Sequence, residues 1–277
     1  MSAATPPRNA IVSSVAGASG GFLSGVLGGG GGAIMIPFMT GPLRMGQHIA
    51  HGTSLAIIVV TAAVAATAFT LTEPISLGLT TALTLGAVSG AIVGAKGALR
   101  IPAMRLRQLL AVFLITVSLR LLISDSINPL LDLSGITELV AGAGIGLVGG
   151  LASGALGVGG GSIFVPALVL VLGVGQHEAQ GISLWVVVAA SLVGAATHYR
   201  QGTVDVTVAR WIAPAALPAA IVGVILATSL SGRSLQVLFA VILSALGVQM
   251  LVTATRRLRR ERRAAAAAEL TAAPDAA

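Results

Sequence analysis

The sequence contains the same segment twice, and this duplication restricts the possible folds more than any other feature. A shift of 129 positions places Pro37 on Pro166, and about half of the positions from Gly17 to Leu55 are then identical. Both copies carry the motif G-x-GGG-x4-P, which begins at Gly28 and at Gly157. The duplication predicts two homologous halves, residues 1–130 and 131–255. A basic and then Ala-rich tail follows over 256–277, and we expect the Ala-rich part to be disordered.

Long apolar stretches show which solvent surrounds these halves. Only 9% of the residues are charged, whereas a soluble domain carries about 25%. Six stretches are long enough to cross a bilayer, which takes about 20 residues. They are residues 50–72, 75–97, 106–124, 179–200, 208–230 and 235–254. The fold class predicted is therefore an all-α polytopic membrane protein.

Each half also contains an apolar segment, a glycine break and a short apolar piece. The pairs are 11–28 with 33–43, and 140–156 with 162–174. The second pieces are too short for an easy crossing. We therefore expect each pair to form a re-entrant helical hairpin. Each half then holds one hairpin and three transmembrane helices, which makes eight helical segments in conventional counting.

The basic residues orient this arrangement. If "RRLRRERR" at 256–263 is cytoplasmic and the hairpins do not cross, all 16 lysines and arginines except Arg120 and Arg233 are cytoplasmic. This distribution follows the positive-inside rule, so we expect both termini in the cytoplasm. Three crossings per half then give the halves opposite orientations, as in many secondary transporters. The positive charge thus indicates a membrane anchor, and no nucleic-acid partner is expected.

The glycine breaks are the first candidate site. Irregular backbone at membrane depth is tolerated only inside protein or beside a wet cavity. The helix after each break presents free N–H groups and the positive end of its dipole, which suits an anion. The candidate binding residues are Gly30, Gly31, Gly32, Ala33, Gly159, Gly160, Gly161 and Ser162. The alternative is that the glycines serve close helix packing, above all Gly20, Gly21 and Gly25.

A polar cluster follows each break and supplies further candidates. The cluster is Gln47, His48, His51, Gly52, Thr53 and Ser54 in the first copy and Gln176, His177, Glu178, Gln180, Gly181 and Ser183 in the second. The candidate binding residues among them are Gln47, His48, Thr53, Ser54, Gln176, His177 and Ser183. Hydrogen-bond donors of this kind could bind substrate oxygens, and histidine can carry a proton. The alternative is an interfacial loop in which hydroxyls cap helices and the histidines face water. Position 53 has no hydroxyl in the second copy, where Ile182 replaces it.

The doubled motif resembles the TauE/SafE sulfite-exporter family of bacterial membrane permeases. The resemblance rests on the two G-x-GGG-x4-P motifs and on A-x-G-T/I-S at Ala50–Ser54 and Ala179–Ser183, and it covers residues 11–255. It implies transport of sulfur-containing oxyanions, such as sulfite or organosulfonates, across the bacterial inner membrane. The second copy departs from the pattern at Ile182.

Other functions remain as alternatives. A passive anion channel fits inverted repeats equally well. An intramembrane enzyme is disfavoured because HExxH and GxxxxGK[ST] are both missing, and a purely structural subunit does not account for twinned helix breaks. We expect no cofactor, catalytic residue or metal site. Protons are the candidate coupling ion because His48 and His177 are the only titratable side chains in both motif copies.

Overall fold

The computed structural model describes residues 10–29, 31–97, 103–123 and 133–272. Within these ranges the backbone alone is described for residues 103–107 and 257–272. Every regular element in that part of the chain is an α-helix. In chain order the helices are α1 (Ala10–Leu27), α2 (Gly32–Thr40), α3 (Gln47–Thr70), α4 (Leu77–Gly97), α5 (Ala103–Ile123), α6 (Ile136–Leu156), α7 (Gly161–Leu172), α8 (Gln176–Arg200), α9 (Val206–Ser229) and α10 (Gly232–Ala272).

The helix lengths confirm a multi-pass membrane protein. Among the described residues, seven helices are long and apolar enough to cross a bilayer: α1, α3, α4, α6, α8, α9 and α10 over Gly232–Arg256. The six predicted spans correspond to α3, α4, α5, α8, α9 and α10, with ends shifted by a few residues. The first members of the predicted hairpins, α1 and α6, are also long enough to cross, so the re-entrant geometry stays a prediction.

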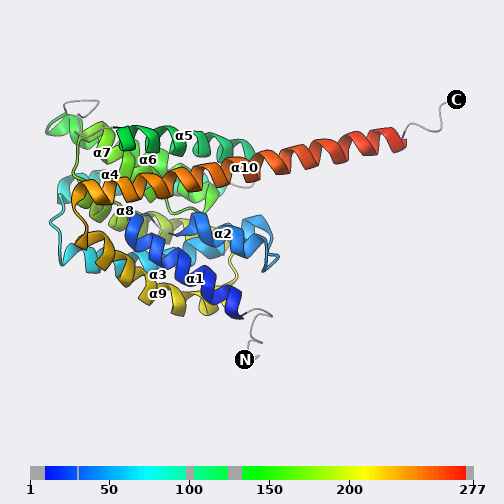
Figure 1. The fold of residues 1–277 in the computed structure, drawn as a ribbon, viewed down its shortest axis with the longest axis horizontal. Helices are drawn as coiled ribbons and strands as arrows, with labels where there is room; N and C mark the ends of the chain where they lie inside the picture. Colours follow the sequence, from blue (N-terminus) through cyan, green and yellow to red (C-terminus); the bar gives the residue numbers. More distant parts are fainter. Residues whose placement is uncertain (1–9, 30, 98–102, 124–132, 273–277) are drawn as a thin grey trace.

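The last helix differs from the prediction for the tail. We expected the Ala-rich segment to be disordered, but α10 continues from the apolar span through the arginines to Ala272. Alanine, arginine, glutamate and leucine are strong helix formers, so nothing in this sequence ends the helix after the span. The expectation of disorder is therefore wrong for residues 264–272. Figure 1 shows this part of α10 extending well beyond the bundle.

The two halves of the chain interlock. In Figure 1, α1 lies along α9 and α5 lies along α10, and α4 likewise packs mainly on α6. The third helix of the first half, α3, packs against the third helix of the second half, α8. Every one of these pairs joins a helix of the first half to one of the second. The halves are repeats in sequence, but they share one core.

Small residues permit the closest of these pairings. A Cβ at Gly86, Gly90 or Gly94 of α4 would overlap a carbonyl oxygen of α6, and Gly146, Gly150 and Gly154 of α6 meet α4 in the same way. Spacing of four residues aligns such glycines on one helix face, where the two backbones can touch. The α1–α9 pair repeats this geometry. There Gly21 and Gly25 lie against the carbonyls of Ala216 and Ala220, so these two glycines have the packing role considered above.

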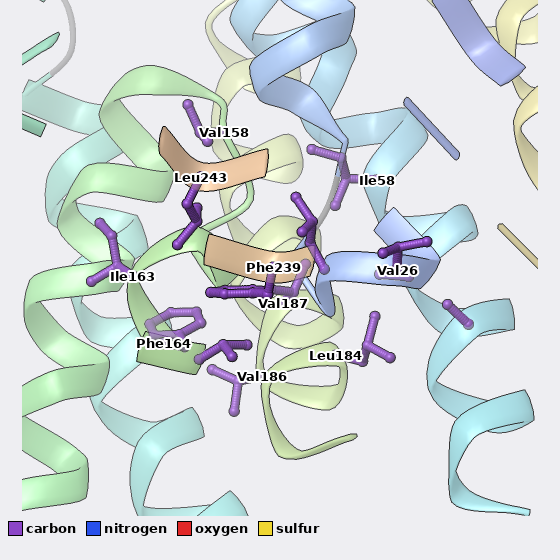
Figure 2. Packing of buried hydrophobic residues seen from close by; sticks show 14 of the residues in the cluster. Val26, Ile58, Val158, Ile163, Phe164, Leu184, Val186, Val187, Phe239 and Leu243 are labelled. Carbon is purple, nitrogen blue, oxygen red and sulfur yellow. The ribbon is translucent and has the colours of Figure 1, made fainter. Parts of the chain in front are cut away.

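Large apolar side chains fill the centre of the bundle. Figure 2 shows buried residues from α1, α3, α7, α8 and α10, with Phe239 and Val187 in the middle of the view and Val158, which belongs to the break between α6 and α7, at its upper edge. Phe164 of α7 and Phe239 of α10 are fully buried in this cluster. Leucines, isoleucines and valines also cover the outside, as at Leu85, Ile225 and Val241. Apolar residues on both sides of the helices are what a bilayer environment requires.

Candidate functional site

Both helix breaks lie inside the protein. Gly28 and Gly29 follow α1, Gly157 to Gly160 follow α6, and all of them are buried, as are Gly31 and Gly32. Gly28 and Gly157, which are 129 positions apart, have φ of +63° and +66°. This left-handed conformation costs L-residues with a Cβ energy, and glycine adopts it readily. The breaks are therefore turns enclosed by other helices, while Gly30 lies outside the described residues.

The two breaks touch each other. A Cβ at Gly161, the first residue of α7, would overlap the Cα of Gly29 in the other break. In the same way a Cβ at Gly32, the first residue of α2, would overlap the carbonyl oxygen of Gly157. Each short helix thus begins against the break of the opposite half. Segments separated by 129 positions in the sequence form one central cluster, which we call the break cluster (residues 28, 29, 31–33 and 157–162).

The break cluster contains two helix N-termini without caps. Gly31 is the N-cap residue of α2 and Gly160 that of α7, and neither helix has a side-chain cap among the described residues. The first intrahelical bonds run from Ile34 and Ile163 back to these glycines. The preceding N–H groups of each helix point out of the helix end, where the dipole is positive. Glycine at these positions lets other groups approach the backbone closely: a Cβ at Gly31 would overlap the Gly20 carbonyl oxygen, and one at Gly160 would lie 2.7 Å from the Phe164 ring.

Two serines connect the halves at the breaks. The Ser54 hydroxyl donates to the carbonyl of Gly157 at 2.8 Å, and the Ser183 hydroxyl donates to the carbonyl of Gly28 at 2.6 Å. The Ser54 hydroxyl is also 2.8 Å from the His51 carbonyl of its own helix, so two carbonyls share its proton. Both serines are fully buried. They were predicted as substrate ligands or helix caps, and in this structure their protons are used by break carbonyls. Each serine therefore holds the opposite half's turn in place.

Thr53 does not bond to a break carbonyl as the two serines do. Its hydroxyl oxygen accepts a hydrogen bond of 2.9 Å from the backbone N–H of Asp205, the N-cap residue of α9. Thr53 thereby fixes the connection between α8 and α9, away from the break cluster. This position explains why the second half can carry Ile182 instead, a residue that is also fully buried.

The glutamine–histidine pairs lie away from the breaks. Gln47 and Gln176 begin α3 and α8, seven residues before the serines that touch the breaks. Seven residues of helix span about 10 Å. His48 is exposed beside His51, with 6.5 Å between the ring centroids, and Nε2 of His177 lies 3.1 Å from the Leu230 carbonyl. The sequence grouped these residues with the breaks, but the structure separates them.

Gln176 borders a cavity of about 600 Å³ at one end of the bundle. Its walls are formed by the connection between α3 and α4, the residues around the start of α8 and the first turns of α10. Figure 1 shows the connection between α3 and α4 at the left of the bundle. Charged side chains of both signs line it, namely Glu73, Glu178 and Arg233. Arg233 donates to the carbonyls of Leu121 and Leu122 and thereby holds the end of α5.

Two residues that flank the breaks, His51 and Gln180, belong to the polar clusters of the sequence but were left out of the candidate binding residues. A Cβ at Gly28 would lie 2.9 Å from the Cα of Gln180, and one at Gly157 would lie 2.8 Å from the Cα of His51. These neighbours also occupy twin positions, 129 residues apart. The sequence did contain a signal for this site, because both copies have a polar residue at this position of the repeat. It was overlooked because the two residues differ.

A bundle of helices long and apolar enough to span a bilayer, with two buried, uncapped helix breaks at its centre, defines a multi-pass helical membrane protein. The chain belongs to the sulfite exporter TauE/SafE family, whose model matches residues 2–121 and 142–274. Among curated proteins it is similar to the probable membrane transporter protein YunE of Bacillus subtilis, with 22% identity over 87% of this chain and 97% of that protein.

A probable membrane transporter protein of Xylella fastidiosa Temecula1 is 26% identical over 88% of this chain and 95% of its own length. Its counterpart in Xylella fastidiosa 9a5c has the same identity and coverage. No solved structure gives a significant match. The family and these relatives indicate a membrane transporter, a class with which the multi-pass helical fold agrees.

Proposed function

We propose that this protein is a secondary transporter of a small sulfur-containing oxyanion, such as sulfite or an organosulfonate, in the bacterial inner membrane. The observation that carries the proposal is the pair of uncapped helix N-termini, α2 and α7, which begin inside the protein against each other's breaks. Such ends attract anions because several N–H groups and the helix dipole act together. The family's description as sulfite exporters agrees with an anionic substrate of this class.

The two halves, residues 1–130 and 131–255, are proposed to insert in opposite orientations, with both termini and the tail 256–277 in the cytoplasm. The distribution of lysine and arginine supports this orientation. The helix α6 is the counterpart of α1 in the second half, and α9 is the counterpart of α4. Because α1 packs on α9 and α6 packs on α4, the two contacts are what a two-fold relation between the halves would produce. Figure 1 also has α1 beginning on the side toward which α10 extends. A site between inverted repeats can open to either side in turn.

Within this scheme the backbone of the break cluster binds the anion. The candidates are Gly30 to Ala33 in the first half and Gly159 to Ser162 in the second. The serines at 54 and 183 hold the breaks, and Thr53 holds the connection before α9. The glutamine–histidine pairs act at the approaches to the site, about two turns of helix away. Proton coupling, if the protein imports its substrate, is assigned to His48 and His177.

The alternative within the same class of substrate is a passive anion channel. A channel also needs a polar path and buried positive ends, so the break cluster alone does not separate the two functions. The close contact of the two breaks, with Gly161 against Gly29, favours a transporter because it leaves no continuous opening between them.

Counterflow in proteoliposomes tests the proposal. Vesicles loaded with excess unlabelled sulfite or an alkanesulfonate are diluted into a trace of the labelled anion, with equal potassium and valinomycin on both sides to hold the membrane potential at zero. Under these conditions a transporter exchanges the two anions and accumulates label transiently above its external concentration, whereas a channel only equilibrates. Accumulation with sulfite or sulfonates but not with acetate supports the proposal. Simple equilibration supports the channel, and the absence of any anion flux rejects both.

A further inference from the structure

The two halves of the break cluster are built alike but carry different side chains. Gln180 lies against Gly28, and its twin His51 lies against Gly157. Ser162 stands in the first turn of α7, and its twin in α2 is Ala33. We call the N-terminus of each short helix, together with these neighbours, a half-site. The half-site at α7 has the amide of Gln180 and the hydroxyl of Ser162, whereas the half-site at α2 has the imidazole of His51 and the methyl group of Ala33. A small anion would not meet equivalent surroundings at the two ends.

Of these four residues, Gln180 has the most unusual surroundings. Its side chain is fully buried, and neither amide atom has a hydrogen-bond partner among the described residues. Its Cβ lies 2.9 Å from the position of a Cβ on Gly28, so the side chain leaves the helix beside the break. Buried amides are nearly always hydrogen-bonded, and an exception requires an explanation. A bound polar ligand provides one.

Ser162 provides the second unpartnered group. The residue is 6% exposed, and its hydroxyl has no partner among the described residues. Because it lies in the first turn of α7, the hydroxyl stays close to the free N–H groups in any rotamer. The backbone nitrogen of Ser162 also lies 3.0 Å from where a Cβ on Gly29 would be. Ser162 and Gln180 therefore approach the same break, Gly28–Gly29, from two helices.

We propose that the substrate anion is bound asymmetrically, at the α7 half-site, by the amide N–H of Gln180, the hydroxyl of Ser162 and the first N–H groups of α7. This inference rests on the proposed function and deepens it, because it names one binding station instead of two equal ones. A tetrahedral or pyramidal oxyanion has three or more acceptor oxygens. It can therefore accept from three donor groups at once, which a carboxylate with two oxygens does less well.

The same face of α8 leads from this half-site to the cavity. Gln176 lies one helical turn before Gln180, is 4% exposed and lines the cavity of about 600 Å³. Its amide atoms also lack partners among the described residues. An anion that enters the cavity would meet the amide of Gln176 first and that of Gln180 next. The opposing carboxylates, Glu73 and Glu178, line the cavity with Arg233.

Binding and stability measured together test this assignment. The probes are sulfite and methanesulfonate, with acetate as the carboxylate control, added to the purified full-length protein. We expect Gln180→Met to raise the Kd for both sulfur anions on the order of tenfold, with a smaller increase for Ser162→Ala. The Tm without anion should not fall in Gln180→Met, because an apolar side chain of similar length replaces an unpaired amide.

Gln236→Met is the matched control. This glutamine lines the same cavity, but its amide donates to the Leu121 carbonyl at 3.1 Å. Its loss should lower the Tm and leave the Kd unchanged. The assignment is overturned if Gln180→Met behaves like Gln236→Met, or if it binds the anions as tightly as the wild type. If the wild type itself binds neither sulfur anion, the proposed function fails and the half-site with it.

Discussion

The hydroxyl of Ser183 donates a hydrogen bond of 2.6 Å to the carbonyl oxygen of Gly28, which lies 155 positions earlier in the chain. The reciprocal bond joins Ser54 to Gly157 at 2.8 Å. Each half of the protein thus holds the turn on which the other half's short helix depends. A carbonyl freed by a helix break needs such a donor because no water surrounds it in the core of the bundle.

Removing either hydroxyl should destabilise the folded protein. Ser54→Ala and Ser183→Ala each leave a buried carbonyl without its donor, which costs about 1–3 kcal/mol. We expect both variants to unfold at lower temperature than the wild type in detergent. Ser89→Ala is the control, because that hydroxyl is exposed and bonds only to Leu85 in its own helix. Equal melting temperatures for all three variants would contradict the role assigned to the two serines.

The glycine contacts between α4 and α6 should be equally sensitive to size. Gly146→Val places a branched side chain against the carbonyl of Leu83, and the two helices must separate to admit it. We expect a strong loss of monodisperse protein on size-exclusion chromatography. Gly144→Val, two residues earlier, has open space around it and should behave as the wild type. A normal yield of Gly146→Val would show that the helix pair tolerates separation.

The helical segments could be predicted from the sequence because bilayer thickness and apolar length are directly related. The six predicted spans, such as 179–200, differ from the helices of the structure by only a few residues at each end, apart from the extended α10. Neither the Ser183–Gly28 bond nor the position of Thr53 could be predicted in the same way. Each depends on which distant backbone group lies opposite, and a single sequence contains no distances.

The candidate site was predicted in part. The glycine breaks stood out because both copies have identical residues there, and the structure places them together at the centre. Gln180 and His51 were overlooked because identity between the copies served as the signal, whereas these twins differ in chemistry. Gln47 and Gln176 were grouped with the breaks because they are near in sequence. Two turns of straight helix carry them about 10 Å away.

Opposite orientation of the halves gives a further prediction, which the absence of cysteine from the chain makes simple to test. Single cysteines at Thr72 and Ser234, both exposed, should react with an impermeant maleimide added to intact cells. A cysteine at Lys96, also exposed, should react only after permeabilisation. If α1 and α6 crossed the membrane while α2 and α7 did not, Lys96 would instead lie outside. Labelling of Lys96→Cys in intact cells would therefore overturn the inverted arrangement.

The last prediction concerns the driving force. A sulfonate remains ionised at physiological pH, and moving one negative charge into a negative-inside cell costs about 2.3 kcal/mol per 100 mV. Import therefore needs a cation moving in the same direction, whereas export is favoured by the same field. His48 and His177 occupy the same position in both copies of the motif, and histidine can carry a proton. If the protein is an importer, we therefore expect it to be coupled to protons.

Liposomes in which the pH gradient and the membrane potential are clamped separately distinguish these cases. For an importer, an inward proton gradient at zero potential and without sodium should drive accumulation of the sulfonate. An exporter driven by potential should respond to the electrical gradient alone, and in that case coupling to protons is wrong. The double variant His48→Gln with His177→Gln then tests the residues, because imidazole is the side chain that titrates near neutral pH. A pH profile unchanged from the wild type would leave proton coupling in place and reject these two histidines as its carriers.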